Sequence, residues 1–340
     1  MRVCVVCYED PDTWILGKFA RHLTTNLKSL GVDTVLARAP ADDVDINYHI
    51  YYGNYRPSQR GNDVLMVTHI DTLDKLMLLK VQMKSAIHAV CMSRETMDRL
   101  TGEGIPADKI SFINPAHDSV IKPRKFRLGI MSKVHSDGRK NEGYLLDIFS
   151  AVDVHDYRLT IMGAGWEQIV QRLTALGLEV EYLPQFDYSV YVELVPNLDY
   201  LLYLSFDEGS MSFVDAVAAG VATIVPPHGF HLDAIAGLTH PVRDAADTIR
   251  VLNRISGDRR AAVDAVRDWT WRRYAEKHLA VFSRLVPDPS VAAERKAASL
   301  NSRSESLATR WHQFLYIAIS WPPTKWNAFK SRIKRSFRIF

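Results

Sequence analysis

Two carboxylates, a glycine and three serines lie between two apolar runs in the second half of the chain. Residues 199–204 (DYLLYL) and 222–225 (ATIV) each read as a buried strand, and residues 205–212 (SFDEGSMS) lead from the first strand into an alanine-rich helix that Gly220 closes. A strand, a helix and a second buried strand in succession indicate one turn of a parallel α/β sheet. Ligands of such sheets bind at the carboxyl ends of the strands, so residues 205–212 form a candidate binding loop.

A second loop brings cations to the same kind of position. Residues 132–141 follow an expected buried strand, precede an expected helix, and contain Lys133, Arg139 and Lys140. Cations and the amides of a helix N-terminus, placed at the end of a strand, can hold the phosphates of a nucleotide. The same residues are also typical of a solvated loop, and the pattern leaves both interpretations open.

The order of these parts resembles the signature of the retaining glycosyltransferases of family 4. In that signature a strand leads to an acidic residue, a glycine-containing loop, a second acidic residue and an alanine-rich helix that ends in glycine; here Asp207 and Asp215 are eight positions apart. Two further segments carry the resemblance, residues 91–118 with their Gly-Ile-Pro turn and residues 269–274 (WTWRRY). It covers residues 1–285 and is strongest over 127–227.

The resemblance implies the GT-B fold, in which two Rossmann-like domains face each other. The alternation of expected strands and helices also indicates parallel, doubly wound sheets. We expect an N-terminal, acceptor-side domain at residues 1–120, a linker at 121–127, and a C-terminal domain for the nucleotide-sugar at 128–286, closing helix included. A basic, aromatic, helical tail follows at 287–340.

Two acids of the candidate loop acquire expected roles from the resemblance. Aligning Gly220 with the glycine of the family places Asp207 and Asp215 at its acidic positions, where glutamate is usual, and Glu208 is an alternative for the first acid. The resemblance implies that the first acid contacts sugar hydroxyls, that the second holds the ribose, and that the amides between them meet the phosphates. Those amides belong to Gly209, Ser210, Met211 and Ser212.

Asp215 also has a purely structural interpretation. Ser212 and Asp215 have the spacing of a capping box, in which the carboxylate would stabilise the N-terminus of the helix. The two interpretations are compatible.

The cations acquire roles in the same way. Lys133 stands where the family has arginine, and Arg139 and Lys140 are alternatives for the second cation that grips the diphosphate. Because such a cation stabilises the charge that develops on the leaving group, we count Lys133 with Asp207 among the candidate catalytic residues.

The first domain contributes one more candidate catalytic residue, His69, and one more candidate donor-binding residue, Gly17. His69, in residues 67–71 (VTHID), follows an expected strand and resembles the histidine-bearing loop that faces the sugar, although a lone histidine is also common as a structural residue. Gly17 stands where the family has a glycine-rich turn before its first helix, but a paired glycine is missing here.

Other site chemistries are also represented in the sequence. Asp43 and Asp45 match the DxD triplet of metal-dependent, single-sheet glycosyltransferases, a pattern short enough to arise by chance. Gly163 and Gly165 follow a strand as in a dinucleotide-binding loop, but the third glycine is missing. A further alternative is a catalytically weak protein of this fold that binds sugar or nucleotide, or serves as a scaffold.

Composition limits the partners. The 340 residues carry a formal net charge of +3, which does not favour nucleic acid, and six of the cations lie in the last 16 residues without an acid. Aromatic residues alternate with these cations, so the segment from Leu307 to Phe340 suits an anionic membrane surface; packing on the first domain is the alternative. Three cysteines and a start unlike a signal peptide predict the cytoplasm, with a peripheral membrane location through the tail.

The combined expectation is a metal-independent enzyme with no cofactor. It would move a sugar with retention from a nucleotide-sugar to a glycan or lipid-linked acceptor.

Overall fold

The computed structural model describes residues 1–286, which form two compact α/β units. One unit combines Met1–Ser119 with the stretch that begins at Asp268, and the other comprises Val120–Arg267. The expected tail, including the segment from Leu307, lies outside the described residues. Within residues 1–286 no helix has the length and apolar composition needed to cross a bilayer.

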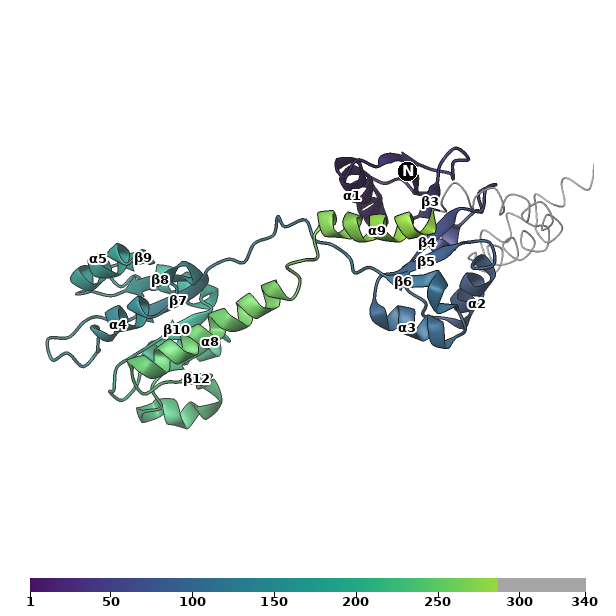
Figure 1. Ribbon diagram of the computed structural model, residues 1–340. Coiled ribbons are helices and arrows are strands. Elements are labelled where there is room, and N and C mark those ends of the chain that lie inside the picture. The colour runs from purple at the N-terminus through teal and green to yellow at the C-terminus, as the bar shows by residue number, and fades with distance from the viewer. Residues whose placement is uncertain (287–340) are drawn as a thin grey trace, which may run out of the picture. The chain divides into compact units, whose positions relative to one another are not determined.

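The first unit is built on a parallel six-stranded sheet in the order β2-β1-β3-β4-β5-β6 (Figure 1). Its strands are β1 (Arg2–Val6), β2 (Asp33–Ala37), β3 (Ile46–His49), β4 (Asp63–Val67), β5 (His88–Cys91) and β6 (Ile110–Phe112). Its helices are α1 (Ile15–Ser29), α2 (Leu73–Gln82), α3 (Arg94–Gly102) and α9 (Trp271–Leu285), with 3-10 turns η1 (Tyr52–Asn54) and η2 (Ala107–Lys109).

Alternate residues of one strand face different helices, as the two-residue period of a strand requires. On β4, Val64 and Met66 belong to the apolar cluster of α1 and α9, whereas Leu65 and Val67 belong to the cluster of α2 and α3. All four side chains are almost fully buried. A parallel sheet covered on both faces explains why its strands read as continuous apolar runs.

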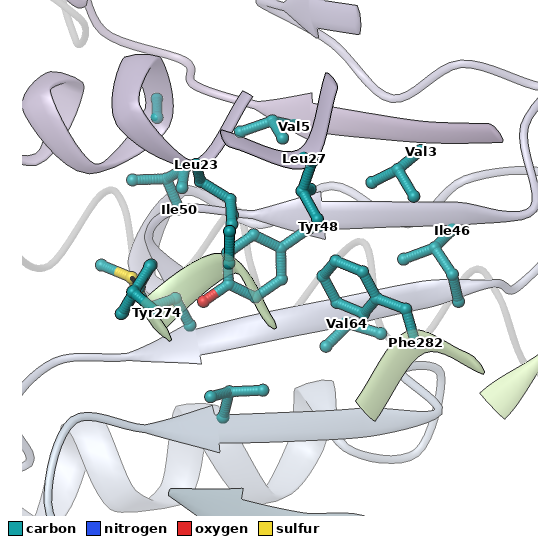
Figure 2. Close-up of a cluster of buried hydrophobic side chains, with 14 of the residues drawn as sticks. Val3, Val5, Leu23, Leu27, Ile46, Tyr48, Ile50, Val64, Tyr274 and Phe282 are labelled. Carbon is teal, nitrogen blue, oxygen red and sulfur yellow. Dashed lines mark hydrogen bonds between the residues drawn. The ribbon is translucent and has the colours of Figure 1, made fainter. Parts of the chain in front are cut away.

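The closing helix α9 packs on the first unit. Figure 2 shows Tyr274 and Phe282 of α9 among side chains of the first sheet and of α1, including Tyr48 and Leu27. The ring of Phe282 lies 5.4 Å from that of Tyr48. Our expectation of a second domain extending to residue 286 is corrected accordingly: the apolar face of this helix is buried by strands that precede it by more than 200 residues.

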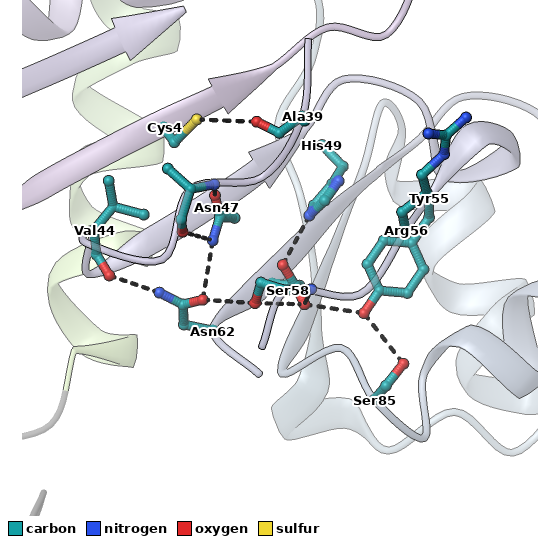
Figure 3. A network of polar contacts seen from close by, with 12 residues as sticks. Cys4, Ala39, Val44, Asn47, His49, Tyr55, Arg56, Ser58, Asn62 and Ser85 are labelled. Atoms are coloured by element: carbon teal, nitrogen blue, oxygen red, sulfur yellow. Dashed lines mark hydrogen bonds and ion pairs between the residues drawn. The ribbon is translucent and has the colours of Figure 1, made fainter. Parts of the chain in front are cut away.

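A buried polar network supports the first sheet beside its apolar core (Figure 3). His49 Nε2 lies 2.9 Å from Oδ1 of Asp63, and both residues are fully buried. The other carboxylate oxygen accepts hydrogen bonds from the Tyr55 hydroxyl and from the Ser58 amide, at 3.1 and 2.9 Å. These bonds satisfy the buried carboxylate and fix residues 55–58 against β3 and β4.

The second unit has a parallel six-stranded sheet in the order β12-β11-β10-β7-β8-β9. Its strands are β7 (Phe126–Met131), β8 (Tyr157–Met162), β9 (Glu179–Leu183), β10 (Tyr200–Leu202), β11 (Ala222–Val225) and β12 (His240–Pro241). Counted within the unit, this is the order of a Rossmann sheet, with the chain reversing direction across the sheet between β7 and β10. The prediction of two α/β units with parallel sheets is thus confirmed.

Helices cover both faces of the second sheet. One apolar cluster joins α4 (Tyr144–Ser150), α5 (Glu167–Ala175) and α8 (Ala245–Asp264) to the sheet, and the other joins α6 (Tyr188–Leu194) and α7 (Met211–Ala218). The unit also contains the 3-10 turns η3 (Val154–Asp156), η4 (Val195–Asn197) and η5 (Gly229–Gly237).

One helix boundary differs from the sequence expectation. We expected helices at 244–255 and 259–285, whereas α8 continues to Asp264 and a new helix, α9, begins at Trp271. The Thr270 hydroxyl accepts a hydrogen bond from the Arg273 amide at 3.3 Å and so starts α9.

Candidate functional site

The candidate loops meet at the switch point of the second sheet. β7 and β10 are parallel neighbours, with Leu128 opposite Tyr200 and Gly129 opposite Leu201. The chain enters α4 after β7 and α7 after β10, and the two helices belong to clusters on opposite faces of the sheet. The loops that follow these two strands therefore diverge from one edge, which is where open α/β sheets hold their ligands.

Two hydrogen bonds tie the loops to each other. The Asn141 side-chain amide donates to the Leu204 carbonyl at 2.9 Å, and the Ser205 hydroxyl donates to the Arg139 carbonyl at 2.8 Å. Asn141 has a φ of 50°, a left-handed conformation that asparagine tolerates better than most residues. The residue between these anchors, Lys140, is consequently held at the end of β10.

Lys140, Asp207 and Tyr203 form a closed group of three. Lys140 Nζ donates to Oδ2 of Asp207 at 2.8 Å and to the Tyr203 hydroxyl at 2.8 Å. The Tyr203 hydroxyl in turn donates to Oδ1 of Asp207 at 2.5 Å. The Lys140 side chain is 10% exposed and that of Asp207 is 27% exposed, so water reaches the acid more easily than the cation.

The charges of this group stabilise each other. Burial alone would raise the pKa of Asp207, but hydrogen bonds from Lys140 and Tyr203 outweigh it and hold that pKa well below its usual range. Burial opposes the charge on Lys140 as well, and its bonds to Asp207 and Tyr203 nevertheless leave its pKa raised. The group therefore presents a permanent ammonium and a permanent carboxylate at neutral pH.

A buried histidine positions the start of α7. Nε2 of His231 accepts a hydrogen bond from the Ser210 amide at 3.0 Å. Nδ1 must then carry the ring proton, which it donates to the Pro226 carbonyl at 2.9 Å. His231 is fully buried, so the segment after β11 fixes the first residues of α7.

The first turn of α7 has backbone amides that no side chain caps. Ser210 is its N-cap residue and makes no side-chain capping bond, so the amides of Met211 and Ser212 have neither an intrahelical acceptor nor a capping side chain. Amides in that position, at the positive end of the helix dipole, favour phosphate.

A close approach of two loops explains one glycine. A Cβ at Gly229 would lie 2.1 Å from the Glu208 carbonyl oxygen, and the φ of 52° at Gly229 is also left-handed. The next amide, that of Phe230, donates to the same carbonyl at 3.0 Å. The start of η5 thus supports the main chain of the candidate loop.

The two alternatives for the first acid have different surroundings. The Asp207 carboxylate points at Lys140, whereas Glu208 is exposed and contributes its carbonyl to Phe230.

The two alternatives for the second cation, Lys140 and Arg139, also have different surroundings. Lys140 reaches Asp207, whereas Arg139 is exposed with its Nη2 3.0 Å from Nδ1 of His135. Lys133 lies at the start of the same loop with an exposed side chain, for which the described part of the chain shows no hydrogen bond or ion pair.

Asp215 lies in the second turn of α7. Its Oδ2 accepts a hydrogen bond from the Tyr191 hydroxyl of α6 at 2.6 Å, and the residue remains exposed. The capping-box interpretation is wrong, because the helix begins one residue before Ser212 and Asp215 is too far into it to reach the first amides.

The candidates of the first unit occupy separate places on it. His69 follows β4; it is exposed, and its carbonyl accepts a hydrogen bond from the Tyr52 hydroxyl at 2.9 Å. Gly17 lies within the first turn of α1, where a Cβ would come within 2.2 Å of the Pro11 main chain. A packing requirement therefore accounts for this glycine.

The DxD pair lies at the opposite end of the first sheet from its carboxyl edge. Asp45 Oδ2 accepts a hydrogen bond from the Arg2 amide at 2.7 Å, and Asp43 forms an ion pair with the Arg2 guanidinium. Among residues 1–286 no three His, Cys, Asp or Glu side chains are grouped so as to hold a metal ion. The two carboxylates thus have structural partners at the amino end of β1.

The second weak motif also has a structural explanation. A Cβ at Gly163, whose φ is 136°, would lie 2.3 Å from the Ser132 carbonyl oxygen. That same carbonyl accepts a hydrogen bond from the Trp166 indole at 2.7 Å. Gly163 therefore lets the loop after β8 support the loop that carries Lys133.

Sequence reasoning missed three residues of this region. Local pattern places Tyr203 in an apolar strand and assigns no role to Asn141 or His231. An amphipathic residue at the carboxyl end of a buried strand was the available signal for Tyr203. The partners of Asn141 and His231 are 63 and 21 residues away, and local pattern does not show contacts of that kind.

Comparisons with known proteins give similarity at low identity. No protein-family model and no curated protein matches the chain. Among solved structures, the apo form of the lipopolysaccharide outer core galactosyltransferase WaaB is 14% identical, with a TM-score of 0.35 over 84% of this chain and 100% of that one. HepE from Anabaena, solved with UDP-glucose, is 14% identical, with a TM-score of 0.34 over 89% of this chain and 100% of HepE.

A glycosyltransferase from Rickettsia africae is 11% identical, with a TM-score of 0.33 over 84% of this chain and 99% of that one. Similarity at this level assigns neither a substrate nor an activity to the present chain.

Proposed function

We propose that this protein is a glycosyltransferase that moves a hexosyl group from a nucleotide-sugar to an acceptor, with retention of configuration and without a catalytic metal. The observation that carries the proposal is the meeting of Lys140 and Asp207 at the switch point of a Rossmann-type sheet. A cation that would bind phosphate and an acid that would accept hydrogen bonds from sugar hydroxyls lie side by side there, next to the uncapped start of α7.

The diphosphate, the sugar and the ribose of a nucleotide-sugar each have a proposed partner on the second unit. Lys140, the exposed Lys133 and the amides of Met211 and Ser212 would hold the diphosphate. Asp207 would accept hydrogen bonds from sugar hydroxyls, and Asp215 would hold the ribose. The positive groups would then stabilise the charge that develops on the departing nucleoside diphosphate.

The acceptor side is proposed for the first unit, where His69 follows β4. The acceptor would be a glycan or a lipid-linked glycan, because the cationic and aromatic segment from Leu307 suits a lipid surface. We propose a cytoplasmic location at the inner face of a membrane. The free thiols of Cys4, Cys7 and Cys91, all buried, are compatible with a reducing compartment.

A second candidate is a protein that binds a nucleotide-sugar but transfers it poorly. Aspartate at both acidic positions favours this reading, because its side chain is shorter than the glutamate that the resembling family uses. Binding is common to both candidates, and turnover separates them.

A thermal-shift screen tests the proposal directly. The purified full chain would be melted with UDP-, GDP- and ADP-linked sugars in EDTA, because a ligand that binds the folded state raises the melting temperature. We expect one nucleotide class to stabilise the protein in the chelator, and release of its nucleoside diphosphate to be faster with enzyme and a glycan acceptor than without enzyme. If no nucleotide-sugar raises the melting temperature, with EDTA or with added manganese, the proposal fails.

A further inference from the structure

We propose that Tyr203 is a positioning residue of the sugar-binding site. Its hydroxyl retains the Asp207 carboxylate when Lys140 turns from that carboxylate to the diphosphate. The inference rests on the proposed function, since it concerns how the same site receives a nucleotide-sugar.

The ring of Tyr203 is held by its surroundings. It is 4% exposed and belongs to the apolar cluster that joins α6 and α7 to the sheet. The ring of His231 meets it edge-on, with centroids 5.9 Å apart. A packed ring places its hydroxyl at a fixed point, which a flexible lysine side chain does not do.

The available protons determine which atom donates in each hydrogen bond among Lys140, Asp207 and Tyr203. An ammonium can only donate and a carboxylate can only accept. Tyr203 therefore uses its single phenolic proton in the hydrogen bond to Oδ1 of Asp207, at 2.5 Å, while its oxygen accepts a hydrogen bond from Lys140 at 2.8 Å. Burial raises the pKa of Tyr203, so the hydroxyl keeps this proton at neutral pH.

The Asp207 carboxylate and a bound diphosphate would compete for the ammonium of Lys140. In the structure its ammonium neutralises Asp207 at 2.8 Å. A diphosphate carries more charge than one carboxylate and would draw the same ammonium. Asp207 would then lose its cation at the moment it must accept hydrogen bonds from the sugar.

Tyr203 resolves the competition on both sides. Its hydroxyl still donates to Oδ1 of Asp207, which leaves Oδ2 for a sugar hydroxyl. Its ring centroid lies 4.9 Å from Lys140 Nζ, so the ammonium can turn on the face of the ring without entering an apolar environment. Phenylalanine at this position would keep the second property and remove the first.

The test is a difference between two affinities, measured by titration calorimetry on the full chain. The probes are UDP with UDP-glucose, GDP with GDP-mannose, and ADP with ADP-glucose. For the pair that wild type prefers, Tyr203→Phe should bind the nucleoside diphosphate as wild type does. The extra affinity that the sugar confers should fall by about 10- to 100-fold, the worth of one hydrogen bond to a charged group.

Tyr200→Phe is the matched control, because it removes a phenolic hydroxyl from β10, three residues before Tyr203. Tyr200 packs instead on Phe126 and His240, with centroids 5.9 and 5.6 Å away. Both affinities should be unchanged in this variant. An equal loss for both ligands in Tyr203→Phe, or no loss for either, would show that the hydroxyl only satisfies a buried pair.

A second variant decides the matter if Tyr203→Phe does not fold. Lys140→Met should lower the affinity for the nucleoside diphosphate. It should keep the extra affinity that the sugar confers, because Tyr203 still holds Asp207. Loss of that extra affinity in Lys140→Met overturns the inference. If wild type binds none of the three pairs, the proposed function fails along with it; if wild type binds and the variants deviate from these expectations, the inference alone fails.

Discussion

The indole Nε1 of Trp271 donates a hydrogen bond to Oδ1 of Asp118 at 2.6 Å. A second hydrogen bond joins the same two segments, because the amide of His117, which precedes Asp118, donates to the Trp269 carbonyl at 2.8 Å. The stretch of chain that leaves the first unit is therefore bonded to the stretch that returns to it. The Trp271 ring also stacks on His22, with centroids 4.5 Å apart, so this pairing is anchored in the core of the unit.

Trp271→Ala should destabilise the first unit strongly. The side chain is 7% exposed and packs with α1, and replacing a buried tryptophan by alanine costs about 3–5 kcal/mol. Urea unfolding would measure the loss. Asp118→Asn is the control, since it keeps an acceptor for the indole and should cost far less. A change below about 1 kcal/mol for Trp271→Ala would mean that α9 is dispensable for the unit.

The separate roles of the two adjacent cations give a second prediction. Lys140→Ala should lower turnover by about 10²–10³-fold, the usual loss when one group that stabilises a leaving anion is removed. Arg139→Ala, its exposed neighbour, should leave turnover almost unchanged. Steady-state kinetics with the preferred nucleotide-sugar would compare them. The reverse order of effects would transfer the diphosphate role to Arg139.

Lys133 belongs to the same experiment. Lys133→Ala should also lower turnover by orders of magnitude while the melting temperature stays unchanged, because its side chain is exposed. Turnover at the wild-type rate would remove Lys133 from the catalytic residues.

A third prediction separates ribose binding from helix packing at Asp215. Asp215→Asn retains an oxygen that can accept from the Tyr191 hydroxyl, now 2.6 Å from Oδ2, but removes the charge. Affinity for the nucleoside diphosphate should fall with little change in stability. Tyr191→Phe is the control, because it breaks the bond between α6 and α7 and leaves the carboxylate. If melting falls in Asp215→Asn and affinity does not, the residue serves only the contact between the helices.

Much of the fold could be predicted from local pattern. The expected helix at residues 188–194 coincides with α6, and Ser93 caps α3 through its hydroxyl, which accepts from the Thr96 amide at 3.1 Å. The features that the sequence did not predict are short elements or contacts between residues far apart in the chain. β12 has two residues, and η5 owes its place to Gly229 packing on Glu208, so neither has a period to detect. The burial of α9 depends on strands that a linear reading cannot place beside it.

The candidate site was predictable in its position more than in its contacts. The carboxyl ends of β7 and β10 follow from the order of apolar runs, and so does the proximity of a cationic and an acidic loop. Which of two neighbouring acids or cations points inward depends on how the loops turn. Asn141 and Ser205 decide that for Lys140, through bonds to residues more than 60 positions away.

A fourth prediction concerns pH and His278 on α9. The ring is fully buried, with Nδ1 donating to the Tyr274 carbonyl and Nε2 2.8 Å from the Tyr48 hydroxyl, and burial lowers its pKa to about 4. The unfolded value is about 6.5, so stability is full above that pH and is lost as pH falls toward 4. As the pH falls, the unfolded state binds a proton on His278 at a higher pH than the folded state does.

The expected size of this effect is about 3 kcal/mol between those pH values. His278→Asn should remove that part of the pH dependence, whatever its own effect on stability. Urea unfolding of both proteins between pH 7.5 and pH 4 would give the difference, in which every other titrating group, including His88 with its similarly lowered pKa, cancels. Parallel curves for the two proteins would exclude His278 as the source.

The last prediction concerns the segment from Leu307 to Phe340. The six cations in its last 16 residues should draw the protein to anionic vesicles, at roughly 1 kcal/mol for each residue near the surface, and salt should weaken this part. Trp311, Trp321 and Trp326 should add an insertion that salt does not remove. Deleting residues 322–340 should therefore abolish sedimentation with vesicles and leave nucleotide binding to the second unit intact. If the full chain ignores anionic vesicles at low salt, or if the deletion lowers the stability of the first unit, the segment is a packing element and the membrane location is wrong.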